Sequence, residues 1–483
     1  QKINETMDFT EIKLSGKTRR EHDLLGEMEI PEEYYFGVQT MRAVENFHIS
    51  RVRLNFFPRL IHALADVKQG AAAANRDLGL LDPAIADAIT RACEELREDR
   101  FNEQFVVDMV QGGAGTSTNM NANEVIANRA LELLGHHKGE YSYCHPNNHV
   151  NLSQSTNDAY PTAVRIALAR SIDSAVTSLQ ELIAAFHAKG EEFADIIKMG
   201  RTQLQDAVPM TLGQEFEAYA ATLTEEIDRL KTNMRLFYEI NMGATAIGTG
   251  INADPDYAEL CTKHLREITG LPLTKAANMI EATSDTGAFI MNSSALKRLA
   301  VKLSKICNDL RLLSSGPRCG LNEINLPPRQ PGSSIMPGKV NPVIPEVVNQ
   351  VAFRVIGNDL AITLASEAGQ LELNVMEPII VLSLFENIEM LVNAMNTLRE
   401  KCIVGITANP EVCRRMVYNS IGLVTALNPY LGYETSTMLA KEALQSGKGI
   451  YDLVLEHKLM DEEELNKILR PENMVHPRKK ITE

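Results

Sequence analysis

The feature that most restricts the fold of this chain is a set of long apolar patterns with helical spacing. Between residues 212 and 237, apolar side chains recur at intervals of three and four: Leu212, Phe216, Tyr219, Leu223, Ile227, Leu230, Met234 and Phe237. That spacing places them on one face of a continuous helix. Similar patterns cover residues 170–198, 288–314, 345–367 and 378–404. Five long helices in one chain predict a bundle.

We therefore predict a mainly α fold, with a long five-helix central bundle flanked by two smaller domains. The expected division is an N-terminal domain over residues 1–155, the bundle over 156–410 and a small C-terminal domain over 411–483. Residues 1–24 are expected to form a flexible, charged lead-in. Shorter helices are expected at 58–76, 83–97 and 121–134. Helices as long as the central five outgrow an ordinary core, so we expect other subunits to cover part of their apolar surface.

Charge and cysteine content narrow the function. The net charge of -15 disfavours nucleic-acid or anionic-membrane partners, which require a basic face. Seven scattered cysteines without a Cys-x-x-Cys pair favour reduced thiols in a cytoplasmic protein. The polar N-terminal stretch has no apolar signal-peptide core, and no uninterrupted apolar run is long enough to cross a bilayer.

Four polar, hydroxyl-rich segments lie between or before the helices, at residues 111–120, 153–158, 200–209 and 332–342. The first two are also explained by helix capping, and the last by a surface turn. In the third, Arg201 and Asp206 fit a structural ion pair, and Thr202 and Gln203 are the candidates for substrate contact. The last segment carries side chains suited to a carboxylate or a reacting proton: Ser333, Ser334, Lys339 and Asn341. Its consecutive small residues can also present backbone N–H groups to an anion.

Histidine, the usual acid–base residue, supplies no convincing centre. His145 and His149 are four residues apart, but no carboxylate or cysteine set completes a metal site around them. His187 lies on a predicted long helix, where a structural role is expected. We therefore expect no metal site and no cofactor.

The segment Gly-Ser-Ser-Ile-Met-Pro-Gly-Lys-Val-Asn-Pro at 332–342 resembles the signature of the aspartase/fumarase superfamily, and the resemblance covers all but about the first 20 residues. Within the superfamily, Gly-Ala-Gly-Thr-Ser-Thr-Asn-Met-Asn at 113–121 is similar to the aspartase form, whereas class II fumarases carry Gly-Ser-Gly-Thr-Gln-Thr. Gly-Arg-Thr-Gln at 200–203 and Leu-Asn-Val-Met-Glu-Pro at 373–378 also resemble aspartases. Fumarases usually have His in place of Gln203, and the segment that corresponds to 373–378 usually has Phe-Lys in fumarases.

The resemblance implies a homotetramer whose active sites are each assembled from three subunits, which would explain four separated loops. It also implies a carbon–nitrogen lyase that converts L-aspartate reversibly to fumarate and ammonia. A proton leaves Cβ, and the carbanion is delocalised into the β-carboxylate as an aci-carboxylate with two negative charges. Preorganised donors around that group should carry most of the catalysis.

The resemblance also assigns roles to individual residues. Around the β-carboxylate it places Thr116, Ser155, Thr156 and Ser334. It places Lys339 and Asn341 at the α-carboxylate, and Asn157, Thr202 and Gln203 around the amino group. The base would be Ser333, whose alkoxide needs stabilisation by backbone N–H groups and Lys339. Glu346, one helical turn beyond the loop, is the competing base.

Three alternatives to an ammonia-lyase remain at this point. A class II fumarase would act on malate. A catalytically silent structural homologue would keep the helical scaffold without turnover, although the loop residues named above are all present. Argininosuccinate and adenylosuccinate lyases usually use a catalytic histidine on another loop, and Gln203 and Ser155 leave no obvious place for it.

Overall fold

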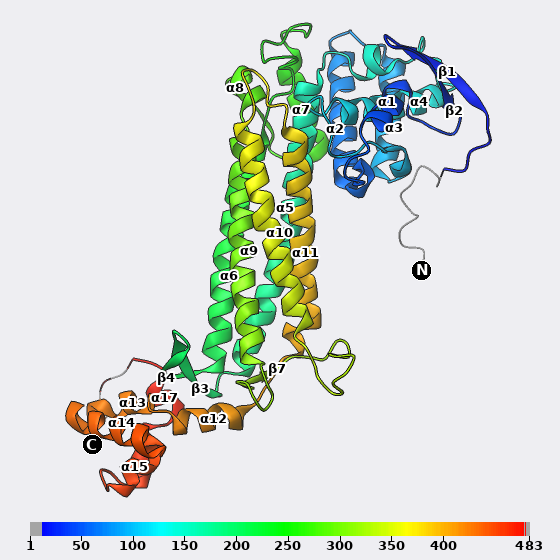
Figure 1. The fold of residues 1–483 in the computed structure, drawn as a ribbon. Helices are drawn as coiled ribbons and strands as arrows, with labels where there is room; N and C mark the ends of the chain where they lie inside the picture. Colours follow the sequence, from blue (N-terminus) through cyan, green and yellow to red (C-terminus); the bar gives the residue numbers. More distant parts are fainter. Residues whose placement is uncertain (1–11, 478, 480–483) are drawn as a thin grey trace. The chain divides into compact units, whose positions relative to one another are not determined.

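The computed structural model describes residues 12–477 and 479, and Figure 1 traces the chain. Its elements before the long helices are β1 (Thr18–Asp23), β2 (Gly26–Pro31), α1 (Val38–Asn46), η2 (Leu54–Phe56), α2 (Pro58–Asp77), α3 (Pro83–Arg97), η3 (Asn102–Gln104), α4 (Thr116–Leu133) and the π-helical turn η4 (Pro146–Val150). Strands β1 and β2 form an antiparallel hairpin. The helices α2 and α3 match their predicted bounds to within one residue.

Five long helices confirm the predicted bundle: α5 (Thr156–Glu192), α6 (Leu212–Met234), α9 (Gly287–Leu313), α10 (Val343–Glu367) and α11 (Glu377–Lys401). Between them lie β3 (Ile197–Thr202), β4 (Gln205–Thr211), η5 (Arg235–Tyr238), β5 (Glu239–Ile240), α7 (Tyr257–Thr269), β6 (Thr274–Lys275), α8 (Met279–Ser284) and β7 (Ile324–Asn325). The C-terminal elements are η6 (Ile403–Gly405), β8 (Thr407–Ala408), α12 (Pro410–Asn419), α13 (Leu423–Leu431), α14 (Tyr433–Ser446), α15 (Ile450–Glu456), α16 (Glu462–Ile468) and α17 (Pro471–Met474).

The chain divides into two compact units. The first holds the chain up to Val176 together with Arg229–Lys297 and Arg354–Met390. The second holds Thr177–Asp228, Arg298–Phe353 and Leu391–Glu483. Each unit therefore contains segments of all five long helices. The three-part division predicted from the sequence stays a prediction.

Buried polar contacts join the long helices within each unit. In the first, Ser293 of α9 donates to Asp359 of α10 at 2.7 Å. In the second, Tyr219 of α6 donates to Asp309 of α9 at 3.1 Å, and the Tyr219 ring packs edge-on against Phe186 of α5. The C-terminal helices of the second unit share an apolar core with Ile197 and Met199 of β3. This core supports the β3–β4 hairpin, which carries two predicted site residues.

Three sequence predictions need correction. Residues 18–23 are not flexible lead-in but strand β1, because Arg19 and Glu21 are buried and paired; the part of the predicted lead-in at 1–11 lies outside the described residues. Helix α4 begins at Thr116, not near 121, because the Asn121 side chain bonds the backbone of Val106 and Gln104 and caps no helix. Residues 193–198 do not continue α5, since β3 begins at Ile197.

Helix α11 is long and strongly apolar. Within Glu377–Gly405, an 18-residue window reaches a mean hydropathy of 1.4, and 67% of that window is buried inside the protein. The core helix of a bundle has this composition, because neighbouring helices cover it on most sides. Although no apolar run of this length was expected from the sequence, the burial of α11 leads us to interpret it as a core helix.

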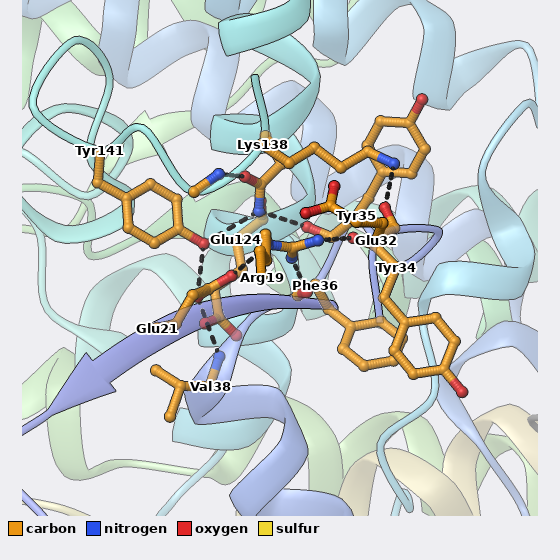
Figure 2. A network of polar contacts seen from close by, with 12 residues as sticks. Arg19, Glu21, Glu32, Tyr34, Tyr35, Phe36, Val38, Glu124, Lys138 and Tyr141 are labelled. Carbon is orange, nitrogen blue, oxygen red and sulfur yellow. Dashed lines mark hydrogen bonds and ion pairs between the residues drawn. The ribbon is translucent and has the colours of Figure 1, made fainter. Parts of the chain in front are cut away.

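A buried polar network closes the N-terminal hairpin over the start of α1 (Figure 2). The Glu21 carboxylate accepts from Arg19, from the Val38 N–H and from the Tyr141 hydroxyl. Glu124 of α4 accepts from the N–H groups of Gln39 and Thr40. Two carboxylates thus satisfy the free N–H groups at one helix N-terminus, where the helix dipole favours negative charge.

This network should make stability depend on pH. Burial, with a smaller contribution from Glu21, raises the pKa of Glu124 from 4.5 to about 7. Between those pH values the unfolded chain releases a proton that the folded chain retains, so the stability present below pH 4.5 is lost as pH rises through 7. We expect Glu124→Gln to flatten this decline, measured by urea unfolding at several pH values between 4.5 and 8. Parallel pH profiles for the two proteins would contradict the assignment.

Candidate active site

The first predicted loop forms a left-handed turn that leads into α4. Gly113, Ala114 and Gly115 all have positive φ, and Gly115 caps the helix. A Cβ at Gly115 would overlap the buried ring of Tyr160 on α5, so only glycine fits this approach. Thr116 is exposed beside a cavity of about 300 Å³, which the Asp23–Arg42 ion pair also lines. Its hydroxyl donates to the Gly113 carbonyl at 2.9 Å, so it must rotate to donate to a ligand.

The Gly115 contact predicts a measurable effect. Gly79 is a matched control, because its φ is also positive (+72°) but a Cβ there would meet open space. Alanine at either position adopts a left-handed conformation at a cost of about 1–2 kcal/mol. We expect Gly115→Ala to lower the unfolding free energy by about 1–3 kcal/mol more, because the ring must move. It should also lower kcat/KM by displacing Thr116. Equal losses in the two variants, measured by urea unfolding, would contradict this contact.

The second predicted segment begins α5 with a reciprocal cap. The Ser155 hydroxyl accepts the Asn157 N–H at 3.1 Å, and the Asp158 carboxylate accepts the Ser155 N–H at 3.0 Å. Burial raises the pKa of Asp158 to about 6, although N–H groups of Ser155, Thr245 and Gly243 oppose this. The Asn157 side chain donates to the Ala246 carbonyl at 2.7 Å. The capping interpretation is thus correct for the backbone, while the hydroxyls of Ser155 and Thr156 remain half-buried at the surface.

Beneath these two segments lies a buried lysine that sequence reasoning missed. Lys68 of α2 is fully buried, and its ammonium donates to the side-chain oxygens of Asn119, Asn151 and Gln154 at 2.6, 3.1 and 2.8 Å. Burial lowers its pKa to about 7, and the negative charge of Asp158 opposes the shift. In the sequence, the position of Lys68 on an otherwise apolar helical face could have indicated that it is buried. The acceptors are 51 to 86 residues away in sequence, so their identity was not readable.

The third predicted loop is a tight β hairpin. Thr202 pairs with Gln205, and the two turn residues, Gln203 and Leu204, both have positive φ. Thr202 and Gln203 are exposed. The predicted Arg201–Asp206 ion pair is wrong: Arg201 pairs with buried Glu323 at 3.0 Å, and Asp206 accepts from Ser420 at 2.6 Å. A carboxylate and a hydroxyl from distant segments thus take the place of the partner expected across the hairpin.

The fourth loop surrounds the candidate base. The Ser333 hydroxyl oxygen accepts the N–H groups of Ile335 and Met336 at 3.2 and 3.1 Å. Two converging N–H donors stabilise negative charge on that oxygen more than the neutral hydroxyl. Ser333 and Lys339 both line an open cavity of about 340 Å³. The side chains of Ser334 and Lys339 are exposed.

The ends of this loop are fixed by close contacts. The Asn341 amide donates to the Gly332 carbonyl, and a Cβ at Gly332 would overlap the Lys339 carbonyl. Glu346, the competing base, lies in the first turn of α10, where a carboxylate favourably faces the helix N-terminus. That position agrees with a structural role for Glu346.

The predicted site residues thus fall into two groups. Thr116, Ser155, Thr156 and Asn157 lie in the first unit, where an Asn119–Thr156 hydrogen bond joins the starts of α4 and α5. Thr202, Gln203, Ser333, Ser334, Lys339 and Asn341 lie in the second unit. Neither unit contains the whole set.

Among residues 12–477 and 479, no group of three or more His, Cys, Asp or Glu side chains is arranged to hold a metal ion. The Nδ1 atoms of His145 and His149 instead accept backbone N–H groups at 2.9 and 2.7 Å. Their spacing therefore has a local structural explanation.

Comparisons with known proteins address which family this chain belongs to. Residues 26–357 match the lyase family model, and residues 423–476 match the fumarase C C-terminus model. An aspartate ammonia-lyase from Pseudomonas aeruginosa is 65% identical over 96% of this chain and 98% of its own. Among solved structures, a fumarate lyase/δ-crystallin protein from Brucella melitensis bound to cobalt is 57% identical, with a TM-score of 0.93 over 95% of this chain and 100% of its own.

A class II fumarase from Schistosoma mansoni has the same fold at lower identity, 35%, with a TM-score of 0.90 over 96% of this chain and 100% of its own. The family match covers more than half of the sequence, and the curated relative matches nearly all of it. The resemblance stated from the loop motifs is therefore confirmed. This chain belongs to the lyase family of the aspartase/fumarase superfamily.

Proposed function

We propose that this protein is an aspartate ammonia-lyase, which removes ammonia from L-aspartate to give fumarate and runs reversibly. The observation that carries the mechanism is the pair of backbone N–H groups on the Ser333 oxygen. These backbone donors can stabilise an alkoxide without help from another side chain. With Lys339 beside the same cavity, the loop supplies both a base and a positive charge for the substrate.

The reaction then follows from where charge develops. Ser333 removes a Cβ proton, and the electron pair moves into the β-carboxylate to form the aci-carboxylate. Thr116, Ser155, Thr156 and Ser334 would donate to that group, and Lys339 and Asn341 would hold the α-carboxylate. The amino group, near Asn157, Thr202 and Gln203, is in its ammonium form; the electron pair of the aci-carboxylate forms the C=C bond as the C–N bond breaks, and the group leaves as neutral ammonia, so a strong general acid is unnecessary. Donors that tighten as the second negative charge forms lower the barrier selectively.

One assay separates this proposal from a class II fumarase. Purified protein is given L-aspartate or L-malate in separate reactions, and fumarate absorbance is followed. We expect fumarate from aspartate and none from malate. Fumarate from malate alone would establish the fumarase alternative, and no product from either substrate with folded protein would favour the silent homologue.

We also infer a homotetramer with active sites shared by three subunits. Along α10, the apolar side chains of Phe353, Leu360 and Leu364 are 59–63% exposed in the single chain, which favours burial by another copy. The division of site residues between two units also fits a composite site. Light scattering should give four times the chain mass. Mixed oligomers of Thr156→Val and Ser333→Ala chains should show more activity than either variant shows alone; a monomer with full activity would refute this inference.

We expect the protein to bind its small-molecule substrate in the cytoplasm. Seven cysteines are free thiols, and six of them are buried. Reduced, buried thiols are typical of a reducing compartment. We therefore infer a cytoplasmic location, which fluorescence microscopy of a tagged chain in its host would test.

A further inference from the structure

The buried Lys68 ammonium fixes the orientation of the amide side chains around it. In its protonated form, the Lys68 side chain has three donors and no acceptor, and here each donor meets one amide oxygen, from Asn119, Asn151 and Gln154. The side chains of Lys68 and Asn119 are buried, so water does not substitute for these partners. The lysine therefore decides which end of each amide faces it.

For Asn119, this choice determines what faces the active site. Its oxygen is held at 2.6 Å from the Lys68 nitrogen, so its NH₂ group must point the other way. That NH₂ donates to the Asn151 oxygen and to the Thr156 hydroxyl oxygen, both at 3.1 Å. A flipped amide would bring its NH₂ group against the ammonium, where donor would face donor.

The orientation of Asn119 also limits what the Thr156 hydroxyl proton can meet. Because Asn119 presents its NH₂ group to Thr156 and not its oxygen, it cannot accept this proton, which is left for another acceptor. Threonine within a helix can donate to the carbonyl four residues earlier, but Thr156 is the first residue of α5 and follows no helical turn. Thr116 differs, because its proton is used on the Gly113 carbonyl.

We infer that Lys68 is a positioning residue which, through the Asn119 amide, fixes the Thr156 hydroxyl as a hydrogen-bond donor to the substrate carboxylate. This rests on the proposed function, in which Thr156 faces the β-carboxylate. Charge on that carboxylate doubles as the Cβ proton leaves. A donor that is already oriented needs no reorganisation at that moment, so its effect falls on kcat more than on KM.

We call the hydrogen-bonded series Lys68–Asn119–Thr156 the relay. Two substitutions interrupt it at different residues. Lys68→Met removes the ammonium and frees the Asn119 amide to flip. Asn119→Asp keeps an oxygen against Lys68, as an ion pair that supports folding, but removes the NH₂ donor to Thr156. We expect each to lower kcat for L-aspartate by about tenfold or more, with KM nearly unchanged. Circular dichroism and thermal unfolding establish that the chains fold; if Lys68→Met does not, Asn119→Asp still decides the question.

The decisive measurement is a double-mutant cycle with Thr156→Val. If the relay acts through this hydroxyl, Asn119→Asp and Lys68→Met cause no further loss of kcat once Thr156 is valine. Asn123→Asp is the matched control, because Asn123 is also a buried α4 residue that donates to Asn151 at 3.2 Å but has no contact with Thr156 among its hydrogen bonds. Asn123→Asp should change kcat by the same factor in the wild-type protein and in the Thr156→Val variant.

The outcomes separate this inference from the proposed function. Additive losses for Asn119→Asp and Thr156→Val would overturn the relay while aspartate turnover by the wild-type protein stands. Full activity of Thr156→Val would also overturn it, since the hydroxyl would then have no role to be oriented for. Absence of aspartate turnover in the wild-type protein would instead refute the proposed function on which the inference rests.

Discussion

The Ser333→Ala variant should lose nearly all turnover of L-aspartate while it keeps its fold and assembly. Removing a general base lowers kcat by about 10²–10⁴-fold. In this variant the missing base is the hydroxyl oxygen that accepts the N–H groups of Ile335 and Met336. The direct measurement is deuterium incorporation at Cβ of aspartate in D₂O, which reports proton removal separately from ammonia release. We expect both exchange and turnover to disappear together.

Two variants make this result specific. Ser446 also accepts a backbone N–H two residues on, from Lys448, but lies at the end of α14, so Ser446→Ala controls for the loss of a turn hydroxyl. Glu346→Gln tests the competing base, and we expect it to keep most of its activity. If Glu346→Gln abolishes exchange and Ser333→Ala does not, the base has been assigned to the wrong residue.

Lys339→Met should weaken substrate binding rather than the chemical step. The α-carboxylate keeps the same charge throughout the reaction, so a contact with it binds ground state and transition state alike. Loss of a charged hydrogen bond of about 1.5–3 kcal/mol corresponds to a fall in kcat/KM of about 10- to 150-fold, mainly through KM. Lys339→Arg keeps the positive charge and should recover part of the loss. A variant with normal KM but low kcat would place Lys339 at the reacting carboxylate or the base instead.

The long helices were predictable because apolar residues recur at helical spacing over many turns. The patterns of α9 and α10 predicted the observed bounds to within two residues. The first turns of α5 were missed, because Ala159, Tyr160, Ala163 and Val164 are all buried and leave no polar face to set a period. Pro161, inside this helix, further obscured its start.

The sequence supplied candidate site residues but not the contacts among them. The hydroxyl-rich loops and their resemblance to the family motifs made Ser333 and Thr156 candidates. The partners that orient them depend on contacts between distant segments. Lys68 could not be linked to Asn119, nor Arg201 to Glu323, without coordinates, because the sequence carries no record of which buried charges and amides meet.

The turn between β3 and β4 shows how this scaffold would respond to selection for heat tolerance. Two-residue hairpin turns with positive φ at both positions favour Asn-Gly, yet this chain has Gln203-Leu204 there. Each non-glycine residue in this left-handed conformation lowers the free energy of unfolding by about 1–2 kcal/mol. A screen that rewarded only survival at high temperature would replace this pair early, and Gln203 would be lost from the candidate site. Thermostable variants of this protein should therefore be selected for stability and catalysis together.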